Sequence, residues 1–402
     1  MPKIYPFKAL MPAAGLEIKV SANTHVDDKR KQTDIVKTNP QSYLKVVKPY
    51  LILDEENDPA KHFEYAQQIL TEFIANGTMK QDENETLYIY RQVNRDIDIE
   101  YIGIICKVLA NDYYDGHIKV HENTLTEKEN HLIAHIKVSG AIGEPVLLTH
   151  FENQDIEELL NKIIKNQPAD VDFFDEVNRH HFIYKITNTE EIIKIQNTYA
   201  QLSDFYIADG HHRSAACARY YKNKCDENGG YLAYIVPANH LLIDSFYRAF
   251  KSNETFNLIN FINTLRLSFN VEKADSQFIP IQAMQFGLCT YQGWYKLTFN
   301  NNLQNQNAVE KLDVSIIENY VFDQILHIKD SKTDNQLTFI KGNTHVSSIE
   351  KQVQNSNFDI VFTVFPCKIE EVFTIADQKM IMPPKSTYIE PKLRTGLTVQ
   401  LV

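Results

Sequence analysis

Residues 209–213, Asp-Gly-His-His-Arg, bring together the side chains that anion and metal sites use. They follow the apolar run 206–208 and precede an alanine-rich segment, an order that predicts a strand, a turn and a helix. Gly210 permits a tight turn, a helix start favours an anion, and the planar fork of Arg213 suits phosphate or carboxylate. The turn therefore indicates an anion or metal site. The alternative is a polar turn whose histidines are satisfied by backbone groups.

Two other stretches carry side chains of the same kind. His121 and Glu122 lie in a polar segment just past a predicted strand, where an acid beside a histidine is a candidate general base. The alternative is a solvated surface turn or a helix cap. Lys385, Ser386 and Thr387 follow two prolines that stiffen their loop. A lysine with two hydroxyls could hold a phosphate or a substrate carboxylate, and the alternative is an exposed C-terminal loop.

The common nucleotide and hydrolase motifs are absent from the sequence. It contains no P-loop, no dinucleotide-binding glycine fingerprint, no zincin histidine pair and no nucleophile elbow. Residues 385–387 resemble the end of a phosphate loop but lack the glycines that expose its amides. A phosphate-handling enzyme with this sequence would therefore use a different fold.

Composition narrows the class of protein. The 402 residues are 43% hydrophobic, enough for a substantial core in two or three domains. A formal net charge of -11 gives little attraction for nucleic acid or anionic membranes, so neither is an expected partner. Five cysteines without a C-x-x-C pair are typical of reduced cytosolic thiols. No apolar run is long enough to span a membrane, and we expect a soluble, cytoplasmic protein.

Local patterns predict strands and helices without a regular βαβ rhythm, which favours the α+β class. Asp58 and Pro59 begin a helix that Gly77 ends, with apolar residues at helical spacing between them. The other predicted helices cover 155–165, 190–199, 315–326 and 370–376, and the helix after the turn at 209–213 ends near Asn223. The predicted strands cover 87–90, 101–106, 231–236, 286–289, 294–297 and 359–365.

Residues 208–213, Ala-Asp-Gly-His-His-Arg, resemble the signature of a large bacterial family, the domain-of-unknown-function 1015 family. Further stretches resemble this family in the same order along nearly the whole chain: 5–10, 39–44, 121–125, 312–316, 330–334, 384–388, 391–392 and 396–397. The signature is also similar to that of free-serine kinases of the ParB/sulfiredoxin-like fold. Those enzymes phosphorylate L-serine from ATP or ADP.

The resemblance implies a role for each matching residue. Glu122 is implied as the base that takes the proton of the acceptor hydroxyl, with His121 beside it in the catalytic group. Asp209 is implied as a catalytic residue and as the ligand of Mg²⁺. The residues implied for the phosphates of ATP or ADP are Gly210, His211, His212 and Arg213, and those implied for phosphate or the amino-acid substrate are Lys385, Ser386 and Thr387.

Together these features predict an α+β protein with a ParB/sulfiredoxin-like nucleotide-binding core at 99–250. An N-terminal α/β region would cover 1–98, and a C-terminal α+β region at 251–402 would contribute a site loop. The implied function is a Mg²⁺-dependent kinase that phosphorylates free L-serine, or a related hydroxy compound, with ATP or ADP. The alternative is a non-catalytic regulatory protein that binds a nucleotide on the same fold. The expected partners are the nucleotide and a small-molecule substrate, and the sequence leaves a homodimer open.

Overall fold

The protein is α+β, as predicted, in a computed structural model that describes residues 1–24, 29–53 and 58–402. These residues form two compact units. Unit 1 consists of Met1–Leu241 and Pro391–Val402, and unit 2 is the continuous segment Leu242–Glu390. In sequence, unit 2 is therefore an insertion between the two parts of unit 1.

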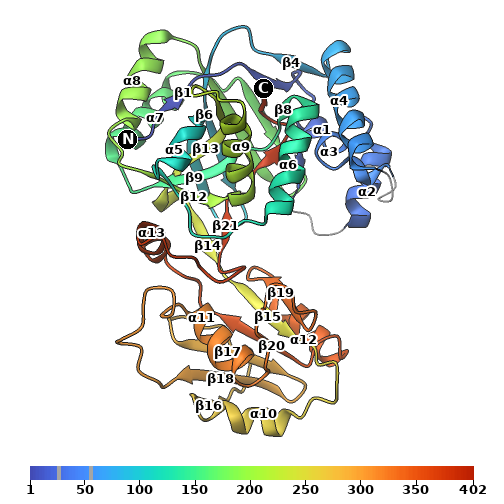
Figure 1. The fold of residues 1–402 in the computed structure, drawn as a ribbon, viewed down its shortest axis with the longest axis vertical. Coiled ribbons are helices and arrows are strands. Elements are labelled where there is room, and N and C mark those ends of the chain that lie inside the picture. The colour runs from blue at the N-terminus through green and yellow to red at the C-terminus, as the bar shows by residue number, and fades with distance from the viewer. Residues whose placement is uncertain (25–28, 54–57) are drawn as a thin grey trace. The chain divides into compact units, whose positions relative to one another are not determined.

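Unit 1 is built on a mixed β-sheet (Figure 1). Its strands run in the order β10-β11-β5-β6-β13-β9-β12-β7, and β1 pairs with β6 beside this path. The strands are β1 (Ile4–Tyr5), β5 (Leu87–Asn94), β6 (Ile99–Leu109), β7 (Ile118–Lys119), β9 (Val146–His150), β10 (Val171–Phe174), β11 (Arg179–Ile186), β12 (Phe205–Asp209) and β13 (Gly230–Pro237). The pairs β9–β13 and β7–β12 are parallel, and the other pairs are antiparallel.

The centre of this sheet is buried on both faces. Every residue of β9 and of β13 is buried, which explains why 231–236 in β13 reads as a continuous apolar run rather than as an alternating pattern. The strands predicted at 87–90, 101–106 and 231–236 are confirmed as parts of β5, β6 and β13. The region boundary predicted at residue 98 falls between β5 and β6, which pair with each other over most of their length.

The helices of unit 1 are α1 (Glu17–Val20), α2 (Lys29–Thr38), α3 (Leu44–Val47), η1 (Pro49–Leu51), α4 (Pro59–Ala75), α5 (Ala110–Tyr114), α6 (Thr126–Ser139), α7 (Gln154–Asn166), α8 (Thr189–Tyr199), α9 (His211–Asn223) and η2 (Ala238–His240). Helix α9 packs on β13 and β9 and contacts α5 and α6, and α6 also contacts α4. In the described part of the chain, no helix is both long enough and apolar enough to cross a membrane.

Helices α4 and α6 show where local patterns succeed and fail. In α4 the Asp58 carboxylate accepts from the backbone N–H of Ala60 at 3.0 Å, and Pro59 is the first helical residue, as predicted. Helix α6 was not predicted. Only Ile136 and Ser139 of α6 are buried, so its sequence lacks the apolar stripe that marks an amphipathic helix.

The C-terminal residues return to unit 1 through two small sheets. Their strands are β2 (Ala9–Pro12), β3 (Ala22–Asn23), β4 (Met79–Gln81), β8 (Ala141–Ile142), β22 (Arg394–Thr395) and β23 (Val399–Leu401). The first sheet has the order β4-β2-β23-β8, and the second pairs β22 with β3. Segments from both ends of the sequence thus complete the same unit.

Unit 2 has its own six-stranded sheet, in the order β16-β18-β17-β20-β15-β19, and a separate pair β14-β21. The strands are β14 (Leu242–Asp244), β15 (Phe246–Phe250), β16 (Phe269–Lys273), β17 (Gln285–Thr290), β18 (Gly293–Phe299), β19 (Leu337–Lys341), β20 (Ile360–Val364) and β21 (Tyr388–Glu390). The helices are α10 (Leu258–Leu265), α11 (Asp313–Ile317), the π-helix η3 (Glu318–Asp323), α12 (Val346–Gln354) and α13 (Ile369–Asp377). The predicted strands of this region are confirmed.

The helix predicted at 315–326 is only partly an α-helix. Residues of α11 continue into the π-helix η3, and the backbone N–H of Leu326 bonds to the carbonyl of Val321, five residues earlier. The wider turn keeps Ile317, Val321 and Phe322 together in the core of unit 2. Propensity does not distinguish the two kinds of helix, because π-turns depend on the packing around them.

Candidate functional site

The turn at 209–213 joins strand β12 to helix α9, as the sequence predicts. The register of β12 against β9 shifts between Ile207 and Asp209, an irregularity that redirects the end of the strand. Gly210 caps α9 in the left-handed region at a φ of +101°, which glycine adopts without strain. Asp209 and Arg213 therefore flank a helix N-terminus whose amides can bind an anion.

The loop after β7 brings the second predicted group to the same turn. Because β7 and β12 are parallel, their carboxyl ends meet at one edge of the sheet. The backbone N–H of His121 donates to Nε2 of His211 at 3.4 Å, and the two rings meet edge to face with centroids 4.4 Å apart. The backbone N–H of Leu125 donates to Nε2 of His212 at 3.1 Å. His121 and Glu122 thus lie beside the turn, although they are far from it in sequence.

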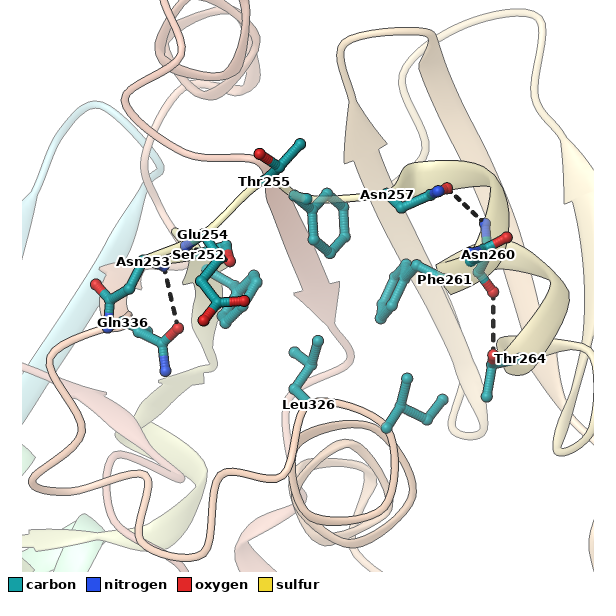
Figure 2. Close-up of a pocket in the computed structure, with 13 residues that line it drawn as sticks. Ser252, Asn253, Glu254, Thr255, Asn257, Asn260, Phe261, Thr264, Leu326 and Gln336 are labelled. Atoms are coloured by element: carbon teal, nitrogen blue, oxygen red, sulfur yellow. Dashed lines mark hydrogen bonds between the residues drawn. The ribbon is translucent and has the colours of Figure 1, made fainter.

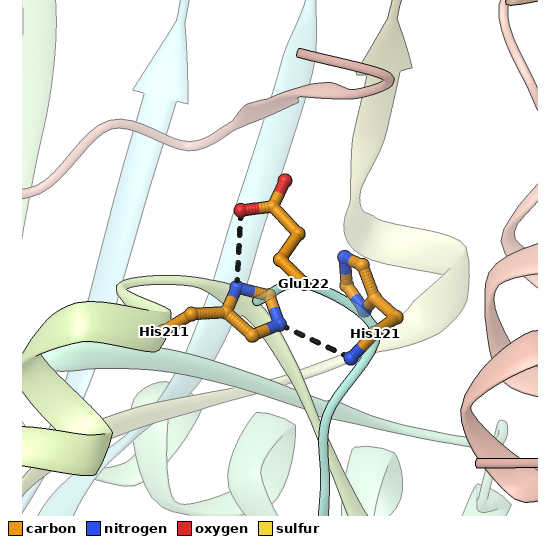
Figure 3. Close-up of side chains that lie close together, drawn as sticks. All are labelled: His121, Glu122 and His211. Carbon is orange, nitrogen blue, oxygen red and sulfur yellow. Dashed lines mark hydrogen bonds and ion pairs between the residues drawn. The ribbon is translucent and has the colours of Figure 1, made fainter. Parts of the chain in front are cut away.

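His211 and Glu122 form a close pair at this junction (Figure 3). Nδ1 of His211 lies 3.6 Å from Oε2 of Glu122. Burial lowers the pKa of His211 to about 3, although the nearby Asp209 acts in the opposite direction. Burial also lowers the pKa of His121 to about 3. Both imidazoles are therefore neutral at pH 7, while the Glu122 side chain keeps 33% of its surface exposed.

Asp209 and Arg213 have charged partners that sequence reasoning missed. Oδ2 of Asp209 lies 3.0 Å from Nζ of Lys392, whose side chain is mostly buried. Nη1 of Arg213 lies 2.5 Å from Oε1 of Glu144 and donates to the carbonyl of Pro145 at 2.8 Å. Lys392 lies in one of the family-like stretches, which was the signal available for it. Glu144 lies in no recognisable motif.

Lys385, Ser386 and Thr387 belong to unit 2, whereas the other predicted site residues belong to unit 1. The buried Ser386 hydroxyl donates to the carbonyl of Pro383 at 2.7 Å and so closes its own turn. Lys385 has a positive φ of 55°, and its Nζ lies 5.0 Å from the centre of the Phe246 ring. These contacts stabilise the loop, and its role in binding stays a prediction.

Two groups of ligand atoms in the described part of unit 1 could hold a metal ion, the first from one residue and the second from three. Asp209 offers the carboxylate oxygens that Mg²⁺ prefers, and the ammonium group of Lys392 competes for them. In the second group, His121, Glu122 and His211 each place one ligand atom within 4.8 Å of the other two. Imidazole nitrogens suit transition metals rather than Mg²⁺, so the two groups differ in the ion they favour.

A pocket of about 520 Å³ lies in unit 2 (Figure 2). Its lining residues come from 250–264, 325–326 and 336. Phe250, Phe256 and Phe261 provide its apolar wall, and Asn257 and Asn260 lie at its polar side. The side chain of Asn257 accepts from the backbone N–H of Asn260 at 3.0 Å, so it caps helix α10. None of the predicted site residues contributes to its lining.

The solved structures that match this chain have low sequence identity to it and low TM-scores. A free serine kinase in complex with AMP has 15% sequence identity and a TM-score of 0.36, covering 75% of this chain and 92% of that one. A conserved hypothetical protein from Pyrococcus furiosus has 16% identity and a TM-score of 0.34, covering 74% and 95%. SbnI with a C-terminal truncation, from Staphylococcus aureus, has 11% identity and a TM-score of 0.40, covering 74% and 87%. Neither the fold type nor the reaction of this chain follows from matches at these scores.

Comparison with known sequences gives a clearer result for the family than for the function. No curated protein matches the chain significantly. A family model described as "Protein of unknown function (DUF1015)" matches residues 4–315, well over half of the chain. This match includes the signature turn and the His121-Glu122 loop. The chain therefore belongs to the DUF1015 family of proteins of unknown function.

Proposed function

We propose that this protein is a nucleotide-dependent kinase that transfers a phosphoryl group from ATP or ADP to the hydroxyl of a small molecule. The observation that carries the proposal is the 3.6 Å approach of Glu122 to His211, the first residue of helix α9. It joins a candidate base to a helix N-terminus that can bind an anion. Free L-serine is the acceptor suggested by the resemblance of the signature to free-serine kinases, and a ParB/sulfiredoxin-like core at 99–250 is part of the same proposal.

The proposed base is Glu122. Its partly exposed carboxylate can accept the proton of an acceptor hydroxyl that comes within hydrogen-bond reach. His211 is neutral, and because its Nε2 accepts a hydrogen bond from His121, its proton belongs on Nδ1, which faces Glu122. That proton can orient the carboxylate. In the same scheme His121 supports the ring of His211 from the other side.

The proposed phosphate site is the start of helix α9. Phosphoryl transfer depends on positioning and on neutralising charge, and the amides of the helix start, His212 and Arg213 supply donors and positive charge for this purpose. The carboxylate of Asp209 fits Mg²⁺ by ligand type, and the ion, when bound, would neutralise charge on the phosphate oxygens. In the proposal, Lys385, Ser386 and Thr387 bind phosphate or the amino-acid substrate.

A second candidate is a nucleotide-binding regulatory protein without catalytic activity. The ion pairs of Arg213 with Glu144 and of Asp209 with Lys392 favour it, because a phosphate or a Mg²⁺ ion must compete with a counter-charge already present. Binding that exchanges these pairs would change the conformation of the turn. Such a change is what a regulatory site requires, whether or not a phosphoryl group is transferred.

The experiment combines purified protein with Mg²⁺, serine and either ATP or ADP, and detects phosphoserine by mass spectrometry. We expect Glu122→Gln to lower turnover by about 100-fold or more, since it removes the base, while calorimetry finds unchanged nucleotide affinity. Arg213→Ala should weaken nucleotide binding. Glu127→Gln, at an exposed position in the first turn of α6, is the matched control. Nucleotide binding without a phosphorylated product from serine or any other hydroxy compound would replace the kinase by the regulatory candidate.

A further inference from the structure

We propose that His121, Glu122 and His211 bind a divalent transition-metal ion such as Zn²⁺ or Co²⁺, at a site that does not use Asp209. One ligand atom from each of the three residues lies within 4.8 Å of the other two. Figure 3 shows the Glu122 carboxylate and the two imidazole rings close together. The inference stands independently of phosphoryl transfer, because it concerns ion binding alone.

His121 supplies the independent observation that points to a ligand. Its side chain is almost fully buried, and neither ring nitrogen has a hydrogen-bond partner among the described residues. Buried polar atoms are nearly always satisfied, and an unsatisfied one in a native protein calls for an ion, a water or a functional role. A metal ion between His121, His211 and Glu122 would satisfy one of these nitrogens.

The chemistry of the three side chains selects the class of ion. Two imidazoles and one carboxylate are the protein ligands of one type of open zinc site, in which the fourth position takes water or substrate. Mg²⁺ and Ca²⁺ prefer oxygen ligands. A histidine binds a metal ion through a neutral imidazole nitrogen, so both rings offer the donor type that such a site uses.

One of the ligand distances already fits a bound ion. Two ligands bound at about 2.1 Å to a tetrahedral ion lie about 3.4 Å apart, and Nδ1 of His211 is 3.6 Å from Oε2 of Glu122. Binding at Nδ1 moves the imidazole proton to Nε2 and ends the hydrogen bond from the backbone of His121. At 3.4 Å this bond is longer than normal, so little is lost with it.

Occupancy by such an ion has a consequence for Glu122. A carboxylate that ligates a transition metal cannot at the same time serve as a free general base. The ion and the proposed reaction therefore exclude each other at this residue. A protein that carries the ion would bind nucleotide through helix α9 but would not use Glu122 to activate an acceptor.

The test measures Zn²⁺ and Co²⁺ binding to metal-stripped full-length protein by calorimetry and by elemental analysis after dialysis. We expect one ion per chain and no displacement by millimolar Mg²⁺. His211→Ala and Glu122→Gln should each weaken binding by 10-fold or more. His180→Ala is the matched control. It removes a histidine that also contacts a carboxylate, that of Asp172, but that lies outside the cluster. An unchanged affinity in both cluster variants would overturn the proposal.

The absorption spectrum of the Co²⁺ protein and thermal melts complete the design. Nitrogen and oxygen ligands should give visible bands without a thiolate charge-transfer band, and the ion should raise the melting temperature of the wild type more than that of Glu122→Gln. Glu122 is partly exposed, so this variant should fold even if a change at the buried His121 does not. A thiolate band, or no binding at all, would refute the site. Neither result would count against the proposed kinase activity, because that activity is assayed with Mg²⁺ as the only metal ion.

Discussion

Gly210 is the residue on which the geometry of the candidate site depends most directly. It holds the left-handed conformation that ends β12 and starts α9. A Cβ atom at this position would lie 3.0 Å from Nε and Nη2 of Arg213. The guanidinium group therefore packs against the glycine, and its Nη1 reaches Glu144 from there. One residue sets both the turn and the position of the arginine.

We expect Gly210→Ala to reduce the free energy of unfolding by about 1–3 kcal/mol, because a side chain in this region is strained, and to displace Arg213. Nucleotide affinity should fall as well, by about 10-fold. Gly15→Ala is the control, since Gly15 also has a positive φ, of +81°, but a Cβ added there would have no described atom within 4 Å. Urea unfolding and calorimetry measure the two effects. Equal results for both variants would show that the contact with Arg213 has no role.

At the scale of elements, the site depends on the carboxyl ends of β7 and β12 and on strand β22. The parallel pairing of β7 with β12 brings the His121-Glu122 loop to the signature turn. Strand β22 pairs with β3 within unit 1 and lies close in sequence to Lys392, the partner of Asp209. The C-terminal segment is therefore part of the support of the site.

Arg394 anchors this segment in a buried network. Its guanidinium donates to the hydroxyl and the carbonyl of Ser21, both at 2.8 Å, and lies 3.4 Å from the buried carboxylate of Asp175. We expect Arg394→Met to destabilise unit 1 by about 3–5 kcal/mol, because it leaves Asp175 buried without its cation. Arg91→Met, at the more exposed pair with Glu100, should cost about 1 kcal/mol or less. Urea unfolding followed by far-ultraviolet circular dichroism compares them, and similar losses would contradict the network's role.

At the scale of the whole molecule, the chain forms two units with separate cores, and the only tryptophan of the sequence, Trp294, lies in unit 2. It is buried, and its Nε1 donates to Glu350 at 2.7 Å. Its fluorescence therefore reports the unfolding of unit 2 by itself. This allows the pH dependence of one unit to be measured within the intact protein.

Asp313 should make the stability of unit 2 depend on pH. Burial raises the pKa of its carboxyl group to about 7, although hydrogen bonds from the backbone of Met284 act in the opposite direction. The folded state therefore binds this proton more tightly than the unfolded chain. The resulting stability is fully present below the unfolded pKa of about 4 and is lost as the pH rises through about 7.

We expect Asp313→Asn to gain stability relative to the wild type between pH 4 and pH 8, by about 1–3 kcal/mol, because the amide keeps the acceptor and removes the charge. Urea titrations followed by Trp294 fluorescence at several pH values give the difference. Asp359→Asn, at a partly exposed carboxylate paired with Lys251, serves as the control. Parallel pH profiles for wild type and Asp313→Asn would show that this carboxylate does not titrate in the range.

The sequence was sufficient for features that neighbouring residues decide. The strand, glycine turn and helix at 205–223 follow from an apolar run, a residue that tolerates positive φ and an alanine-rich segment. Helix α4 follows from its cap and its apolar spacing. The α+β class was predicted from such local patterns, the family was predicted from the resemblance of the signature and other stretches, and both are confirmed. The roles of Glu122, Asp209, Arg213 and the other site residues stay predictions, because their chemistry depends on what they bind.

The tertiary structure decided which distant residues meet. Lys392 reaches Asp209 across 183 positions of sequence, and Glu144 reaches Arg213 from a loop without any motif. The His121-Glu122 loop meets His211 only because β7 and β12 are parallel neighbours in the sheet. Local backbone preferences act over a few residues, whereas strand order and burial arise from the packing of the whole unit. For that reason the turn could be read from the sequence, whereas its ionic partners and the burial of the His121 imidazole could not.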